Sequence, residues 1–167
     1  FDLHFRTGNQ DKRETTLQLG SYGVEFATEG PLKKGSASYL VNYRYSTLSI
    51  LEKLIPQING LPTSTDLSFK VYIPLRKAGI FSLWSINGMS KVTFEAKTDT
   101  LEWETNNDNI QYDIHYDLTA TGLNHRKIIG NKSYLFSSVS YSATRYTYHS
   151  SYLRKSLAFT AFNDQNE

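Results

Sequence analysis

Apolar and polar residues alternate with a period of two along much of the chain. The clearest case is Ile110–Thr121, where apolar side chains at even positions alternate with polar side chains at odd positions. Phe1–Arg6, Ala37–Ser46 and Leu67–Ile73 follow the same pattern. Because successive side chains of a strand point to opposite faces, each stretch predicts a strand with one apolar and one polar face.

Three further stretches predict strands with less regular alternation: Thr15–Glu29, Ile80–Phe94 and Lys132–His149. In the first of them the phase changes near Gly20–Ser21, which predicts a β-bulge. Seven strand-like segments follow one another. The predicted fold is therefore all-β, an antiparallel meander of about seven long strands in a single segment covering residues 1–167.

The connections between these segments differ in length and charge. The short ones are polar and basic, and they are Asn9–Arg13, Pro31–Gly35, Arg76–Gly79 and His125–Lys132. The long ones are Thr47–Asp66 and Glu95–Asn109. Helical spacing of apolar residues predicts a short helix at Leu48–Ile55 in the first long connection. The end of the chain, from Ser150 to Glu167, predicts a loop with a weak strand at Ser156–Phe162.

Two architectures produce this pattern. A soluble β-sandwich or small barrel also alternates apolar and polar residues. Strands of about ten residues, alternating short and long connections, and tyrosines near strand ends favour a transmembrane β-barrel. The direction of the apolar face distinguishes the two: it points outward to lipid in a membrane barrel and into a core in a sandwich.

Composition excludes several classes of protein. The chain has 167 residues, 14% aromatic residues and a formal net charge of +2, and a disordered chain would have fewer aromatics and more charge. No basic run predicts a nucleic-acid partner, and the pairs Lys33-Lys34, Arg76-Lys77 and Arg126-Lys127 are interpreted as solvated turn residues. With no cysteine, disulfide scaffolds and cysteine-based sites are excluded.

Several stretches are similar to one known family. The opening sequence FDLHFRTGNQDKRETTLQLGSYGVEFATEGPLKKGSASYLVNYRYSTLSIL resembles the start of the barrel in TonB-dependent outer-membrane receptors. The similarity is greatest to the branch that carries an N-terminal carboxypeptidase-regulatory-like domain. The matching elements are FDLHFRTGN, the turn at Glu29–Gly35, the strand at Ser38–Leu48 and the strand–turn–strand stretch Asp66–Ser90.

The resemblance implies a location and a role. The chain would be the early part of a 22-stranded receptor barrel in the outer membrane of a Gram-negative cell. The parent would import a nutrient, either an iron chelate, a glycan or a peptide. Its implied partners are outer-membrane lipid, the plug domain of the same parent chain, the TonB energy-coupling complex acting through that plug, and a surface lipoprotein. The plug is not recognisable in this sequence.

The polar strand faces supply the candidate binding residues. Arg44, Lys70, Asp113, His115 and Asp117 are predicted to face the lumen and contact substrate. Asp113, His115 and Asp117 lie at i, i+2 and i+4, so one strand face carries all three. Such a row could bind a divalent metal, but a polar lumen wall explains it as well, and no metal or cofactor is predicted.

No sequence motif indicates an enzyme. Gly-x-Ser-x-Gly is missing, and Glu102, Glu104 and Asp108 lie in a polar loop that is better explained as a solvated acidic loop than as a glycosidase pair. No catalytic residue is assigned. The alternative function is a soluble β-sandwich module for adhesion or carbohydrate binding, in which tyrosines, Trp84 and Trp103 would stack on sugar rings.

Overall fold

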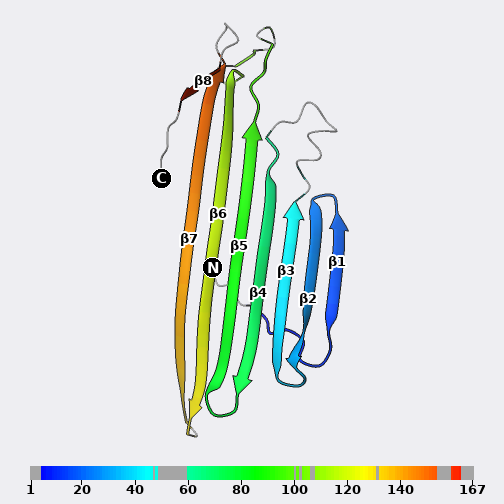
Figure 1. Cartoon of the computed structure of the whole chain (residues 1–167), viewed down its shortest axis with the longest axis vertical. Helices are drawn as coiled ribbons and strands as arrows, with labels where there is room; N and C mark the ends of the chain where they lie inside the picture. Colours follow the sequence, from blue (N-terminus) through cyan, green and yellow to red (C-terminus); the bar gives the residue numbers. More distant parts are fainter. Residues whose placement is uncertain are drawn as a thin grey trace.

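The described residues of the computed structural model form one antiparallel sheet. The structure describes residues 5–46, 48, 60–99, 101, 103–105, 108–130, 132–153 and 159–162. Each strand pairs with its neighbours in sequence, so the order is a simple meander (Figure 1). The strands are β1 (Glu14–Gly20), β2 (Gly23–Lys33), β3 (Ala37–Ser46), β4 (Thr63–Leu75), β5 (Gly79–Phe94), β6 (Ile110–Ile129), β7 (Ser133–Leu153) and β8 (Phe159–Phe162). The all-β meander predicted from the alternation is confirmed.

The sheet is open in the part of the chain that the structure describes. β1 pairs with β2 alone, and β8 pairs only with Ser150–Leu153 at the end of β7. The remaining edge of β7, from Ser133 to His149, has no described strand beside it. Two rows of backbone donors and acceptors are thus left for partners outside the described strands.

Two predicted strands are arranged differently. The stretch Thr15–Glu29 forms two strands joined by a turn at Ser21–Tyr22, so the phase change marks a hairpin and not the predicted bulge. An irregularity in register does occur later, between Pro31 and Lys33. Phe5 and Arg6 lie outside any strand, and Phe1–His4 lies outside the described residues.

The two ends of the sheet carry different connections. The turn end carries three tight turns, at residues 34–36, 76–78 and 130–132. Each has a nearby glycine with a left-handed φ, namely Gly35 (69°), Gly79 (96°) and Gly130 (62°), a conformation that costs glycine little. The loop end carries the connections between β3 and β4 and between β5 and β6. Both long connections lie at the loop end, but the two-residue turn Ser21–Tyr22 between β1 and β2 lies there too, so the predicted alternation of short and long connections is observed only from β2 to β7.

Some boundaries differ from the expected ones. β6 continues to Ile129, so most of the expected turn His125–Lys132 is strand. β7 continues to Leu153, and β8 lies inside the weak strand predicted at Ser156–Phe162. Apart from Leu48, the expected helix at Leu48–Ile55 lies outside the described residues.

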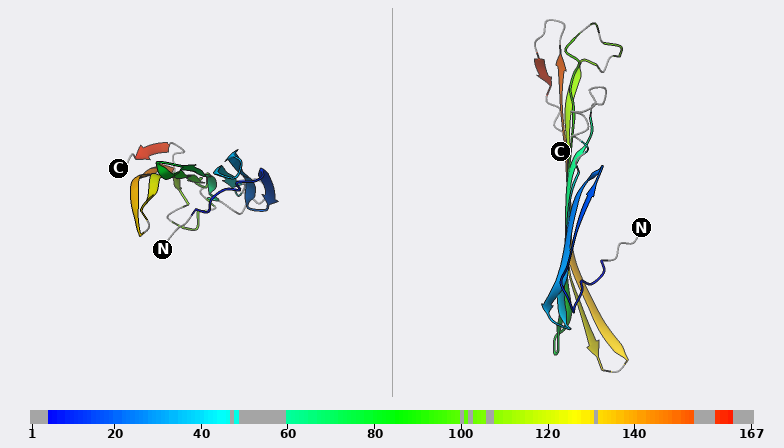
Figure 2. Two further views of the ribbon diagram at one scale, coloured as in Figure 1. Left: turned by 90° about the horizontal axis from the view of Figure 1, so that it is seen from below. Right: turned by 90° about the vertical axis from the view of Figure 1, so that its right-hand side faces the viewer.

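The sheet is a single twisted layer (Figure 2). Among the described residues, the buried hydrophobic side chains are Ala37 and Leu153, whereas many large apolar side chains are exposed. A folded domain normally buries such side chains in one contiguous cluster. The apolar surface of this sheet therefore has no cover among the described residues. Within the same part of the chain there is no helix long and apolar enough to cross a membrane.

Candidate functional site

The pairing register assigns every strand residue to one of two faces, since directly paired residues lie on the same side of a sheet. The Val71 face is named after a row of direct partners: Tyr39, Val71, Leu83, Leu123 and Val139. The Lys70 face is named after the adjacent row: Leu40, Lys70, Trp84, Gly122 and Ser140. The first row is apolar throughout, and the second is mixed.

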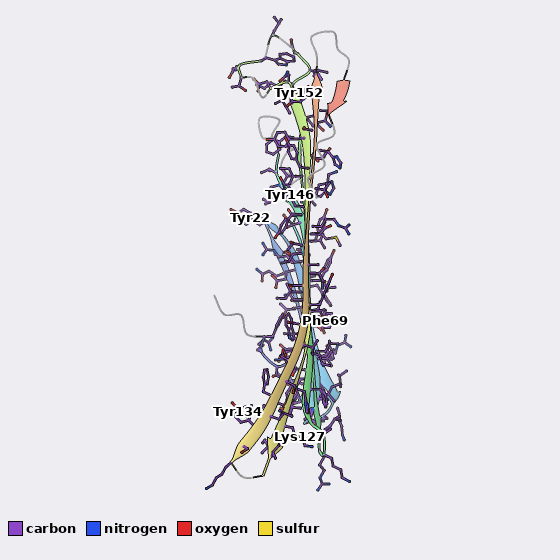
Figure 3. All side chains as sticks on the ribbon, turned by 90° about the vertical axis from the view of Figure 1, so that its left-hand side faces the viewer. Tyr22, Phe69, Lys127, Tyr134, Tyr146 and Tyr152 are labelled. Atoms are coloured by element: carbon purple, nitrogen blue, oxygen red, sulfur yellow. The ribbon has the colours of Figure 1, made fainter. Side chains whose placement is uncertain are left out.

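An uncovered apolar band crosses the Val71 face. Its members are Leu17, Leu19, Val24, Phe26, Tyr39, Val41, Tyr43, Tyr45, Leu67, Phe69, Val71, Ile73, Leu75, Phe81, Leu83, Leu123, Leu135, Val139 and Tyr141. Leu19 is 72% exposed and Val139 75% exposed. In the edge-on view of Figure 3, Phe69 lies on the side of the sheet opposite Tyr146.

The apolar band runs obliquely to the strands. On β2 the band includes Phe26. The row of direct partners of Phe26 runs through Tyr43, Leu67, Asn87 and Thr119 and reaches Ala143 on β7. On β7, however, the band is centred near Val139, closer to the turn end. It thus descends by about four residues over five strand spacings, roughly 13 Å along the strand for about 24 Å across, which is a slope of about 30°.

Towards the loop end of β5–β7, the Val71 face becomes polar and the Lys70 face becomes apolar. There the Val71 face carries Lys91, Thr93, Asp113, His115, Asp117, Arg145, Thr147 and His149. The Lys70 face carries Val92, Phe94, Tyr112, Ile114, Tyr116, Tyr146 and Tyr148 at the same level. Phe94 stacks on Tyr112 at 4.4 Å between ring centroids. The apolar band therefore has a sharp end along β5–β7.

The five candidate residues fall on opposite faces. Arg44 and Lys70 lie on the Lys70 face, whereas Asp113, His115 and Asp117 lie on the Val71 face. The two groups therefore cannot line the same lumen wall. The polar stripe predicted on β6 lies towards the loop end, where the Val71 face is the polar face. Asp113, His115 and Asp117 share one face of β6, whereas Arg44 lies opposite Asp66, four residues along β4 from Lys70.

The row on β6 is engaged in cross-strand contacts. Asp113 accepts a hydrogen bond of 2.6 Å from Thr93 and lies 3.8 Å from the ammonium of Lys91. Asp117 is the direct partner of Arg145. Among the described residues, no group of three or more potential ligands is arranged to hold a metal ion. The contacts fit a charged wall exposed to water.

A segment before β1 crosses the Lys70 face, which the sequence did not predict. Arg6 donates two hydrogen bonds, of 2.6 and 2.5 Å, to the carboxylate of Glu29 on β2. The backbone N–H of Asn9 donates to the same carboxylate at 2.8 Å. Lys70 donates to the carbonyl oxygen of Phe5 at 2.8 Å. Glu29 thus anchors the segment at three points, and Lys70 fixes its start.

A hollow of about 460 Å³ lies on the Lys70 face beside this segment. Its walls include Phe5, Lys70, Trp84, Asn124, Phe136 and Ser138. The rings of Phe5 and Trp84 lie 6.2 Å apart, and Ser138 donates to Asn124 at 2.8 Å. Aromatic faces beside an amide, a hydroxyl and an ammonium can hold a sugar ring or a peptide side chain.

The acidic loop at the loop end is folded around Asp108. The side-chain oxygen Oδ2 of Asp108 accepts hydrogen bonds from the backbone N–H groups of Glu104 (2.6 Å) and Thr105 (2.8 Å). Lys97 lies 3.4 Å from the other carboxylate oxygen. The two backbone donors, from Thr105 and Glu104, followed by the Lys97 ammonium, hold the pKa of Asp108 below its usual value. This carboxylate therefore stays charged and shapes the loop.

Comparison with known proteins identifies no relative, because no family model, curated protein or solved structure matches this chain.

Proposed function

We propose that this chain is part of the barrel wall of a TonB-dependent receptor in the outer membrane of a Gram-negative cell. The parent protein imports a nutrient, either an iron chelate, a glycan or a peptide. Its plug domain and the TonB energy-coupling complex supply gating and energy. The sequence resemblance suggests the family, and the apolar band is the observation that carries the proposal.

On β4 the apolar band has the length that a lipid-facing surface needs, whereas on β6 it consists of Leu123 alone. It lies on one face, has no cover among the described residues, and runs on β4 from Leu67 to Leu75. A tilted transmembrane strand needs about 9–11 residues. The slope of about 30° is close to the strand tilt of about 35–45° in outer-membrane barrels. A band level with the bilayer would thus tilt these strands by a similar amount.

The arrangement of the two ends supports the same proposal. Barrels of this class have short turns on the periplasmic side and long loops outside. Both long connections of this sheet lie at the loop end, together with the two-residue turn between β1 and β2, whereas the turn end carries tight turns. The free edges of β1 and β7 would be unfavourable in lipid, where each backbone polar group needs a partner. Further strands of the same barrel would pair with them.

The Lys70 face then lines the lumen. Arg44 and Lys70 face the interior, and the segment Phe5–Asn9 lies inside the barrel, where a plug would sit. Asp113, His115 and Asp117 instead belong to the outer surface of the wall above the bilayer. The acidic loop stands at the outer rim and takes part in capturing the nutrient.

A soluble carbohydrate-binding sandwich is the alternative. It requires a second sheet packed on the apolar band, and the described residues form one sheet. The hollow beside Trp84 is compatible with a sugar, but it lies on the opposite face from the apolar band. The sandwich therefore needs a separate partner layer, which makes it the weaker explanation.

Spin labels distinguish the two surroundings directly. The chain has no cysteine, so Val139→Cys and Thr147→Cys each introduce one thiol into it for labelling. Both residues lie on the Val71 face of β7, Val139 inside the apolar band and Thr147 beyond its end. In native membranes we expect the label at position 139 to collide with oxygen and that at position 147 with a water-soluble nickel complex.

Other results would contradict the proposal. A label at position 139 that meets neither reagent indicates a packed protein core and favours the sandwich. Ser140→Cys, on the neighbouring residue but the Lys70 face, is the matched control and should not share the oxygen preference of position 139. An antibody against the chain should also detect an outer-membrane protein several times larger than 19.1 kDa. A soluble protein near 19.1 kDa detected by the same antibody would refute the receptor proposal.

A further inference from the structure

The turn end of the sheet gathers positive charge from separate parts of the chain. The basic rim consists of Lys33, Lys34, Arg76, Lys77, Arg126, Lys127 and Lys132, all of them exposed. In sequence these residues form dispersed pairs, but the meander brings their three turns to one end of the sheet (Figure 1). The rim is a property of the fold.

One of the three turns is tied to the strand that leads into the next turn. His125 lies 2.6 Å from the carbonyl oxygen of Ala78, through its Nε2 atom, and its ring stacks on Phe81 at 4.4 Å. The turn after β4 is thereby held against the end of β6. Successive turns are two strand spacings apart, about 10 Å, which is close to the distance over which charges act on each other at physiological salt, about 8 Å.

The three turns of the basic rim contain no carboxylate, although Asp11 lies next to Gln10, whose carbonyl oxygen accepts a hydrogen bond from the N–H of Gly35 in the first turn. Residues 32–38, 73–81 and 124–138 contain no Asp or Glu. None of the ion pairs among the described residues includes a rim residue. The loop end has the opposite character, since Glu95, Asp99, Glu102, Glu104 and Asp108 lie in one connection with a single Lys97. The two ends of the sheet thus differ in sign.

The rim borders exposed apolar surface. Leu75, Ile129 and Leu135 lie beside the cations on the Val71 face and are about half exposed. Arg126, whose guanidinium lies 5.6 Å from the centre of the Tyr134 ring, belongs instead to the Lys70 face. A lysine at the border between an apolar layer and water lays its hydrocarbon stem against the layer and keeps its ammonium in water. A ligand that matches the rim therefore needs an anionic head and an apolar tail.

We propose that the basic rim binds the phosphate headgroups of anionic phospholipids in the leaflet next to the turns. This inference rests on the proposed membrane location and adds a lipid preference to it. The headgroup phosphates lie against Lys77, Lys127 and Lys132, while the acyl chains cover the neighbouring part of the apolar band. The rim fixes how deep the turn end lies in the membrane. If the turn end moved into the hydrocarbon layer, the cations would lose their contacts with the phosphates.

The test measures which lipids remain on the protein. The full-length protein purified from membranes is placed in phosphatidylcholine nanodiscs with a minor fraction of phosphatidylglycerol, and the lipids retained after detergent extraction are counted by native mass spectrometry. We expect enrichment of phosphatidylglycerol. Lys77→Gln with Lys132→Gln should reduce this enrichment about tenfold or more, and high salt should reduce it in the unaltered protein.

A matched variant removes the same charge elsewhere. Lys91→Gln with Arg145→Gln lies at the loop end of β5 and β7 and should leave the enrichment unchanged. Equal losses in both variants, or no enrichment at all, would overturn the proposal. Displacement of the lipid by inorganic phosphate would show that the site recognises phosphate alone, and a rim-dependent affinity for duplex DNA without lipid enrichment would indicate nucleic acid instead.

The outcomes separate this inference from the proposed function. If the protein enters nanodiscs of pure phosphatidylcholine but shows no preference for phosphatidylglycerol, only the lipid site is refuted. If it enters neither type of nanodisc, the proposed membrane location fails and the lipid site fails with it.

Discussion

The indole ring of Trp84 occupies the space above Gly122 on the neighbouring strand. A Cβ atom built on Gly122 would lie 2.6 Å from Cζ2 of Trp84 and 2.7 Å from Cε2. The two residues are direct partners in the ladder between β5 and β6. The missing side chain of Gly122 therefore lets the ring lie close to the backbone and shape the hollow on the Lys70 face.

Replacing this glycine should displace the ring. For Gly122→Ala we expect a loss of about 1–3 kcal/mol in the free energy of unfolding, since the added methyl group overpacks the site. Urea unfolding in detergent micelles measures the change, with the fluorescence of Trp84 read in a Trp103→Phe background. The control is Gly88→Ala on β5, where the nearest atom to a new Cβ is a flexible carboxylate oxygen at 3.2 Å. A larger loss at position 88 would contradict the packing argument.

The pair Arg6–Glu29 should hold the segment before β1 on the sheet. A double-mutant cycle with Arg6→Ala and Glu29→Gln is expected to give a coupling energy of about 1 kcal/mol, since the two parallel hydrogen bonds are favourable but Arg6 is 64% exposed and screened. Amide hydrogen exchange of residues 5–13 should rise in each single variant. The exposed pair Lys12–Glu14 serves as a comparison and should couple more weakly.

The acidic loop should lose order at low pH. The pKa of Asp108 is lowered in the folded protein, mainly by the backbone donors of Thr105 and Glu104. Its stabilising effect is therefore complete above the pKa of an unfolded aspartate, about 3.9, and is lost as the pH falls through the lower folded value. NMR shifts of the Glu104 and Thr105 amides should report this transition. In Asp108→Asn the transition should vanish; if it persists, another group controls the loop.

A charge placed in the apolar band should be costly if the band faces lipid and cheap if it faces water. Val139 is 75% exposed within the chain, so Val139→Arg removes little internal packing and in water would change stability by about 0.5 kcal/mol or less. In a bilayer we expect a loss of about 2–4 kcal/mol. Thr147→Arg, on the same strand and face but beyond the band, should cost about 0–1 kcal/mol. The free energy of unfolding from lipid vesicles measures the cost of each substitution. Equal costs would show that the apolar band does not end between positions 139 and 147.

The period of the alternation was enough to predict the sheet. It also grouped Tyr39, Tyr43 and Tyr45 correctly on one face, because that grouping needs only the period of a single strand. The alternation near Gly20–Ser21 was ambiguous, since a bulge and a two-residue hairpin both shift the phase there. In the structure Gly20 pairs with Gly23 across the turn, so the phase change marks the hairpin.

The relation between faces of different strands could not be predicted in the same way. Whether Asp117 shares a face with Arg44 depends on the register across several strands, and a shift of one residue would reverse the answer. Similarly, nothing local links Arg6 with Glu29, which are 23 residues apart. Only the three-dimensional pairing showed that the polar stripe of β6 and the polar faces of β2–β4 lie on opposite sides.

The exchange of polarity in β5–β7 sets the height of the acidic loop. If the apolar band marks the hydrocarbon layer, β7 leaves that layer near Ala143 and continues to Leu153, a further run of roughly 30 Å along the strand. The backbone N–H of Leu153 donates to the carbonyl oxygen of Asn109 at 2.8 Å, which ties the acidic loop to this extension. A diffusing molecule would thus meet the carboxylates well before it reached the bilayer, and the β-strands would serve as a rigid stalk for the first point of contact.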